Sequence, residues 1–125
     1  MTQTPKRVAI VDDDESVRRA LGRLLRSAGM LPECFDSAEA FLDSLATRRP
    51  DCLLVDVRMP GMDGSELLQR LSELGHCIPA VVITAHEDDT TSRPERFPGA
   101  IAFLLKPLDD QILLNAIRNA QASPP

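Results

Sequence analysis

Five short, almost continuous apolar runs constrain the fold of this chain more than any other feature of its sequence. Each run is four or five residues long, and the runs are Arg7–Val11, Leu31–Phe35, Cys52–Val55, Ala80–Thr84 and Ile101–Leu105. Strands that are buried on both faces have this composition, whereas half-buried strands alternate apolar and polar residues. The runs therefore predict five strands inside a sheet.

Segments with helical apolar periodicity separate most of these runs. The stripes consist of Val17, Leu21, Leu24, Leu25 and Ala28; Phe41, Leu42 and Leu45; Leu67, Leu68, Leu71 and Leu74; and Ile112, Leu113, Ala116, Ile117 and Ala120. Gly29 and Gly75 are predicted helix stops, Asp36 is the predicted N-cap of the second helix, and Asp109 or Asp110 that of the last. Strands that alternate with helices predict a parallel sheet with helices on both faces.

The stretch between the fourth and fifth runs departs from this alternation. A helix is expected in Glu87–Ala100, but Pro94 and Pro98 fall inside it and most of its first half is polar. A proline inside a helix costs about 3 kcal/mol. We therefore expect a short, displaced or disordered element there, mobile and low in local stability.

The composition excludes several classes of protein. A chain of 125 residues is one domain's worth, and its net charge of -5 counts against binding of nucleic acid or an anionic membrane by this segment. The apolar runs are far shorter than the ~20 residues of a membrane span. We expect residues 1–5 to be a disordered N-terminus without a signal peptide, residues 6–121 to form the domain, and residues 122–125 to be a tail or the start of a linker.

Three cysteines bear on the cellular compartment. Cys34, Cys52 and Cys77 are odd in number and contain no C-x-x-C pair, which fits neither a disulfide framework nor a zinc site. We expect them to be buried or half-buried thiols in a reducing cytoplasm.

Polar residues follow several of the predicted strands, at the edge where open parallel sheets bind ligands. Asp12 and Asp13 follow the first run, Asp56 the third, and Lys106 the fifth, while Thr84 ends the fourth. If the first and third strands are neighbours, the three carboxylates converge. Two carboxylates about 4 Å apart repel by ~4 kcal/mol at an effective dielectric constant of 20, so a bound cation or a proton must offset their charge.

The residue types at this edge point to a particular chemistry. Ligand sets made only of oxygen atoms suit Mg²⁺. A carboxylate nucleophile, a divalent cation, a lysine and a hydroxyl donor are the parts that phosphoryl transfer requires.

Four motifs at the ends of predicted strands carry a family resemblance. Ile10–Asp13, Asp56–Gly64, Ile83–Ala85 and Phe103–Pro107 together resemble the receiver domains of bacterial two-component response regulators, and the similarity covers nearly the whole of residues 6–121. The resemblance implies a flavodoxin-like (βα)5 three-layer sandwich with a parallel five-stranded sheet in the order 2-1-3-4-5.

The resemblance also implies roles for the acidic residues. Asp56 would accept a phosphoryl group from the phosphohistidine of a sensor histidine kinase. Asp12, Asp13, Asp56 and the backbone carbonyl of Arg58 would bind Mg²⁺. The domain would help to catalyse its own phosphorylation and dephosphorylation, as a switch rather than a dedicated enzyme.

Further roles follow from the same resemblance for residues near the other strands. Lys106 and Thr84 would stabilise the phosphoryl group, Thr84 and Phe103 would act as switch residues, and Arg58 and His86 flank the site where the family tunes phosphoryl lifetime. The Lys106–Pro107 bond is predicted to be cis. Simpler interpretations stay open: Thr84 as an ordinary strand residue, Phe103 as core, and His86 as a solvated loop residue.

The output of such a switch would lie outside the chain. Phosphorylation would shift an equilibrium between two conformations. The run Phe35–Leu42 resembles LuxR/FixJ-like receivers joined to helix-turn-helix DNA-binding domains, which favours transcription control by an attached domain. A homodimer formed on phosphorylation is a further expectation, although Pro94 and Pro98 count against the standard form. The domain itself is expected to contact neither nucleic acid nor membrane.

Three alternative functions compete with this hypothesis. Many phosphohydrolases and mutases with an aspartyl-phosphate intermediate carry a general acid two residues after the nucleophile, where this chain has Arg58, which cannot donate a proton. An FMN binder needs a Gly/Ser/Thr-rich phosphate loop after the first strand, and Asp12–Glu15 would repel the phosphate. A pseudo-receiver, an interaction module that never takes a phosphoryl group, stays open because of the irregular Glu87–Ala100 segment.

Overall fold

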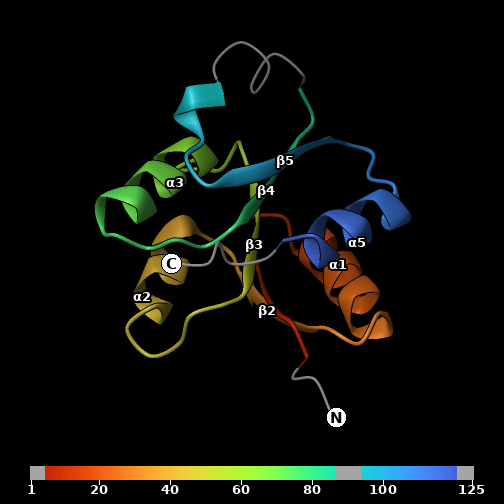
Figure 1. The fold of residues 1–125 in the computed structure, drawn as a ribbon. Helices are drawn as coiled ribbons and strands as arrows, with labels where there is room; N and C mark the ends of the chain where they lie inside the picture. The colour runs from red at the N-terminus through yellow and green to blue at the C-terminus, as the bar shows by residue number, and fades with distance from the viewer. Residues whose placement is uncertain (1–4, 87–93, 121–125) are drawn as a thin grey trace.

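The computed structural model of the chain describes residues 5–86 and 94–120, in which strands and helices alternate (Figure 1). Five strands form one sheet: β1 (Arg7–Val11), β2 (Leu31–Phe35), β3 (Cys52–Asp56), β4 (Ala80–Thr84) and β5 (Ala100–Leu105). Their order is β2-β1-β3-β4-β5, and every neighbouring pair is parallel. The predicted order 2-1-3-4-5 is confirmed, and β1 and β3 lie side by side.

Helices cover both faces of this sheet. They are α1 (Glu15–Ser27), α2 (Ala38–Ser44), α3 (Gly64–Glu73) and α5 (Asp110–Arg118), together with the 3-10 helix η1 (Pro94–Arg96). Figure 1 shows α1 and α5 on one side of the sheet and α2 and α3 on the other. The predicted three-layer sandwich is therefore present.

The helical layers bury two separate cores, one on each face of the sheet. Successive residues of a strand point to opposite faces, so Val11 and Val55 pack toward α2 and α3 whereas Ile10 and Leu54 pack toward α1 and α5. The central strands β1, β3 and β4 are buried almost throughout. This double burial holds the ends of β1 and β3 in place.

The two edge strands differ from the prediction. In β2 no residue is fully buried, and in β5 every second residue is exposed. The expectation that all five strands are buried on both faces was wrong for these two. Edge strands lie at the rim of the helical layers, where less of each face is covered.

Polar side chains fix the start of each helix. Asp14, Asp63 and Asp109 are the N-caps of α1, α3 and α5, and Asp63 forms a reciprocal capping box with Glu66. The cap of α2 is Ser37, whose hydroxyl accepts a hydrogen bond from the amide of Ala40. The prediction of Asp36 as this cap was wrong by one residue, because helix ends depend on local backbone geometry.

Two of the cysteines and Leu74 differ from the sequence-based expectations. Cys52 is buried, but Cys34 and Cys77 are exposed, so the expectation of burial was wrong for two of the three cysteines. Leu74, assigned to the apolar stripe of α3, is 51% exposed just beyond its C-terminal end. Between β4 and β5 the described residues form only η1, and residues 87–93, on which much of the prediction for Glu87–Ala100 falls, lie outside the described residues.

A lysine before β1 fixes the end of α5. The Lys6 ammonium donates to the carbonyls of Ile117 at 2.8 Å, Ala120 at 2.6 Å and Arg118 at 3.4 Å. The last carbonyls of a helix have no partner within the helix, and a positive charge there also complements the helix dipole. In the described part of the chain, no helix has the length and hydrophobicity that crossing a bilayer requires.

Candidate phosphoryl and metal site

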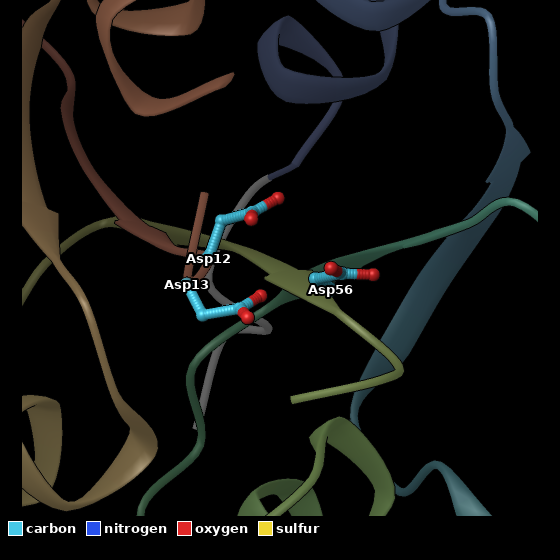
Figure 2. A group of neighbouring side chains, drawn as sticks. All are labelled: Asp12, Asp13 and Asp56. Atoms are coloured by element: carbon cyan, nitrogen blue, oxygen red, sulfur yellow. The ribbon is translucent and has the colours of Figure 1, made fainter. Parts of the chain in front are cut away.

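Three carboxylates meet at the carboxyl ends of β1 and β3. Asp12 and Asp13 lie on the segment after β1 and Asp56 is the last residue of β3, as Figure 2 shows. One carboxylate oxygen from each lies within 4.8 Å of the others. The pairing of β1 with β3, with Val11 opposite Val55, brings Asp13 close to Asp56, which lies 43 positions later in the sequence.

Backbone contacts hold this acidic cluster in place. The amide of Asp12 donates to the carbonyl of Phe35 at 3.2 Å, and the Asp12 carboxylate accepts from the amide of Asp14 at 2.9 Å. Under Asp56, Gly64 lies so close that a Cβ atom on it would be 2.6 Å from the Asp56 carbonyl oxygen. The first residue of α3 therefore packs directly against the backbone of Asp56.

Lys106, the residue after the edge strand β5, brings a positive charge to the same cluster. Its ammonium nitrogen lies 3.7 Å from an Asp12 oxygen and 3.8 Å from an Asp56 oxygen. The backbone amide of Lys106 donates to the carbonyl of Thr84 at 2.8 Å, which fixes where the side chain begins. The Lys106–Pro107 bond is cis, which confirms that prediction.

The charge balance of the cluster favours a cation. Burial raises the pKa of the Asp56 carboxyl above its ordinary value of 3.8, and the nearby Asp12 charge raises it further, against the opposing effects of Lys106 and a backbone hydrogen bond at Arg58. Burial likewise raises the pKa of Asp12. One lysine thus compensates only part of the negative charge of three carboxylates. Oxygen ligands, converging charge and partial burial together fit a hard divalent ion such as Mg²⁺.

Thr84 lies at the end of β4, and its side chain is engaged with the following loop. The residue is 3% exposed. Its hydroxyl donates to the carbonyl of His86 at 3.0 Å and accepts from the amide of His86, also at 3.0 Å. Both of these bonds involve the backbone of His86, whose side chain is exposed. The hydroxyl of Thr84 is therefore occupied at the edge of the sheet where the carboxylates lie.

Phe103 lies on β5, apart from the acidic cluster. It is 40% exposed, and its ring packs edge-to-face on Phe97 with centroids 5.6 Å apart. Arg58 is exposed on the loop after β3. The structure thus gathers Asp12, Asp13, Asp56 and Lys106, and it places Phe103 on a neighbouring surface.

Sequence reasoning missed one residue that contacts this cluster. Arg18, in the first turns of α1, donates from its guanidinium to the backbone carbonyl of Asp12 at 2.8 Å. In the sequence this arginine is one of several along α1, and no motif distinguishes it. The contact depends on the helix turning the side chain back toward the loop before it.

Comparison with known proteins is consistent with this geometry. The family model described as the response regulator receiver domain matches residues 8–118. The chain is 43% identical over 113 residues to the response regulator protein TmoT of Ectopseudomonas mendocina, covering 90% of this chain and 51% of that protein. It is 40% identical over 123 residues to the transcriptional regulatory protein FixJ of Bradyrhizobium diazoefficiens, covering 97% and 60%.

A solved structure agrees with these matches. The crystal structure of FixJ-N superimposes with a TM-score of 0.85 at 38% identity, covering 94% of each chain. The chain spans about half the length of the curated relatives it matches.

Proposed function

The chain belongs to the response regulator receiver domain family, and on that premise we propose that it accepts a phosphoryl group on Asp56 from a sensor histidine kinase. The observation that carries the proposal is the meeting of three carboxylates with Lys106 at one edge of the sheet. A carboxylate nucleophile requires neighbouring groups that neutralise the charge of the transferred phosphoryl oxygens. The residues around Asp56 are of the types that can do this.

The proposed reaction is an in-line displacement at phosphorus. An oxygen of the Asp56 carboxylate forms a new O–P bond, the N–P bond of the phosphohistidine breaks, and its electron pair returns to the imidazole. Mg²⁺, when bound, neutralises charge on the phosphoryl oxygens. Asp12, Asp13, Asp56 and the backbone carbonyl of Arg58 would hold this ion.

Lys106 and Thr84 take the remaining charge-stabilising roles in this proposal. The Lys106 ammonium already lies 3.8 Å from an Asp56 oxygen, within reach of a group attached to it. Thr84 carries a hydroxyl that can donate a hydrogen bond to the phosphoryl group once it leaves the carbonyl of His86. Arg58 and His86, on the loops after β3 and β4, are the proposed residues that tune the lifetime of the phosphoryl group.

The proposed result of phosphorylation is a changed surface. Movement of Thr84 away from His86 alters the loop after β4, and Phe103 turns inward as its surroundings change. The response is a shift between two conformations. Because the relatives include a transcriptional regulatory protein of which the matched region covers only 60%, we propose transcription control through an attached DNA-binding domain, in the cytoplasm, with homodimer formation as a further step.

The proposal also includes the extent of the domain. We assign residues 6–121 to the receiver domain, residues 1–5 to a disordered N-terminus, and residues 122–125 to a tail or linker. The family match to residues 8–118 lies within the proposed bounds.

One experiment tests the function directly. The protein is incubated with acetyl phosphate and Mg²⁺, and its intact mass is measured. We expect a gain of one phosphoryl group that is lost in Asp56→Asn and in the presence of excess EDTA. Asp51 lies just before β3, at the end of the strand away from the cluster, so Asp51→Asn serves as the matched control and should still gain the group.

The same experiment separates the alternatives. A folded protein that never gains mass, with acetyl phosphate or with a phosphorylated kinase, would instead act as a pseudo-receiver. A gain of mass that survives in Asp56→Asn would place the acceptor elsewhere and contradict the assignment.

A further inference from the structure

We propose that Arg18 is a positioning residue for the phosphoryl and metal site, because its guanidinium holds the backbone carbonyl of Asp12 at the start of the loop Asp12–Asp14. The inference rests on the proposed function and adds to it a residue outside the four motifs. Arg18 would touch neither the ion nor the phosphoryl group. Its effect would be to keep the two carboxylates of this loop in the arrangement that binds Mg²⁺.

The first observation is a side-chain contact from α1 to the loop before it. The Arg18 guanidinium donates to the carbonyl oxygen of Asp12 at 2.8 Å, in a partly buried position. The backbone amide of Arg18 also donates to the carbonyl oxygen of Asp14 at 3.0 Å, but this is the first intrahelical bond of α1, and any residue other than proline at position 18 would form it. The contact that depends on the arginine side chain is therefore the one to Asp12.

The second observation is the place of Asp12 in the sheet. The strand β1 pairs with both neighbours up to Val11, which lies opposite Phe35 on one side and Val55 on the other. Asp12 is the next residue, and it is only 2% exposed. A buried carbonyl without a donor destabilises the fold, and a guanidinium supplies a charge-assisted hydrogen bond at any physiological pH.

The other side-chain hydrogen bonds described for this loop involve its carboxylates and not the Asp12 carbonyl. The amide of Asp14 donates to the Asp12 carboxylate, and the Asp14 carboxylate accepts from Ser16 and Val17. These bonds set side chains relative to the start of α1. The Arg18 guanidinium instead binds the backbone of Asp12, on which the direction of the Asp12 and Asp13 side chains depends.

The neighbouring arginine provides a contrast. Side chains of a helix point toward its N-terminus, so Arg18 reaches back to the loop. The side chain of Arg19 is 72% exposed, and it pairs with Glu15 at 3.3 Å on the outer surface. Arg19 has the same charge in the same helix turn without the contact to Asp12, which makes it a matched control.

The test compares Arg18→Met, Arg18→Lys and Arg19→Met in the full chain. The dissociation constant for Mg²⁺ is measured by isothermal titration calorimetry, and the rate of mass gain with acetyl phosphate is measured over a range of Mg²⁺ concentrations. Loss of a residue that orients metal ligands typically weakens metal binding 10- to 100-fold. We expect about a tenfold weaker Mg²⁺ affinity in Arg18→Met, partial recovery in Arg18→Lys, and a change within about twofold in Arg19→Met.

A second readout separates positioning from simple stabilisation. In Arg18→Met the phosphorylation rate should recover toward that of the unmodified protein at saturating Mg²⁺, whereas loss of folded protein would lower the rate at every Mg²⁺ concentration. The folded fraction is followed by circular dichroism. If Arg18→Met does not fold, Arg18→Lys and Arg18→Gln carry the comparison with the same expected direction.

The possible failures are distinguishable. A folded Arg18 variant that binds Mg²⁺ as tightly as the unmodified protein overturns the positioning role alone. An unmodified protein that neither binds Mg²⁺ nor gains a phosphoryl group overturns the proposed function, and this inference with it.

Discussion

The centre of the sheet and its β5 edge both carry apolar side chains, but these are buried at the centre and partly exposed at the edge. Residues 8–11 of β1, Cys52–Val55 of β3 and all of β4 are buried on both faces, and the acidic cluster lies at the ends of β1 and β3. On β5, Ile101, Phe103 and Leu105 are 48%, 40% and 49% exposed. The centre is held by packing on all sides, and the edge presents a row of apolar side chains to solvent.

A rigid site and a changeable surface can therefore share one sheet. Close-packed interiors resist displacement, so groups that must stay within a few tenths of an ångström of one another are best carried by buried strands. A partly exposed side chain such as Phe103 has fewer neighbours to displace when it moves. Lys106 connects the two regions, because it follows β5 and reaches the carboxylates at the centre.

The largest expected contrast comes from truncating one leucine in each region. Leu54 in β3 is 1% exposed, and Leu105 in β5 is 49% exposed. Leu54→Ala should lower the free energy of unfolding by about 2–5 kcal/mol because it leaves a cavity, and Leu105→Ala by less than about 1 kcal/mol. The measurement is urea unfolding followed by circular dichroism, since the chain has no Trp or Tyr. Equal losses would refute the contrast.

A second prediction concerns the backbone under Asp56. A Cβ on Gly64 would lie 2.6 Å from the Asp56 carbonyl oxygen and 3.0 Å from the Cα of Val57, so Gly64→Ala must displace the end of β3. We expect a loss of about 1–3 kcal/mol in stability together with slower phosphoryl uptake.

The control for Gly64→Ala is another glycine in a helix. A Cβ on Gly22 of α1 would meet only the end of the Arg26 side chain at 3.6 Å. Gly22→Ala should therefore raise the stability, by up to ~1 kcal/mol, through better helix propensity. A stabilising Gly64→Ala would show that the centre is less tightly held than its packing indicates.

Truncating a side chain on the β5 edge should lower the stability less than truncating Leu54, even at the aromatic residue Phe103. Phe103→Ala removes an edge-to-face contact with Phe97, worth about 0.5–1.5 kcal/mol beyond the area it buries. We expect a total loss of about 1–3 kcal/mol, and a smaller loss for Ile101→Ala. Chemical unfolding of both variants checks this order. A loss above ~3 kcal/mol for Phe103→Ala would mean that the edge is as tightly packed as the centre.

The last expected effect is a gain in stability, and it arises from Asp56 at the centre of the sheet. Burial first, and the charge of Asp12 second, raise the pKa of the Asp56 carboxyl above 3.8 in the folded protein. The folded state then binds more protons than the unfolded chain between these two pKa values. The contribution of Asp56 to stability is therefore fully present below about pH 3.8 and is lost as the pH rises through the folded-state pKa.

Removing the charge should consequently stabilise the protein without metal. Asp56→Asn at pH 7 is expected to raise the unfolding free energy by about 1 kcal/mol, a fraction of the ~4 kcal/mol repulsion between carboxylates about 4 Å apart. Thermal unfolding with and without Mg²⁺ measures it, and the gain should shrink when Mg²⁺ stabilises the unmodified protein. A less stable Asp56→Asn at pH 7 in EDTA would contradict this account of the charges.

Much of the fold followed from local patterns. The limits of β1, β2 and β4 agree with the apolar runs to the residue, since buried parallel strands are written as continuous apolar segments. The exposure of β2 and β5 was not predictable in this way. An apolar run looks the same whether or not a helix covers both of its faces.

Residue types alone identified Asp12, Asp13, Asp56 and Lys106 as members of one site, because the carboxyl ends of parallel strands share an edge. Their meeting depended on β1 lying next to β3, which is a property of the strand order. The contact from Arg18 to the Asp12 carbonyl lay beyond sequence reasoning, as did the packing of Gly64 on Asp56. Backbone carbonyls carry no signature in the sequence, so only the folded chain decides which side chain satisfies each of them.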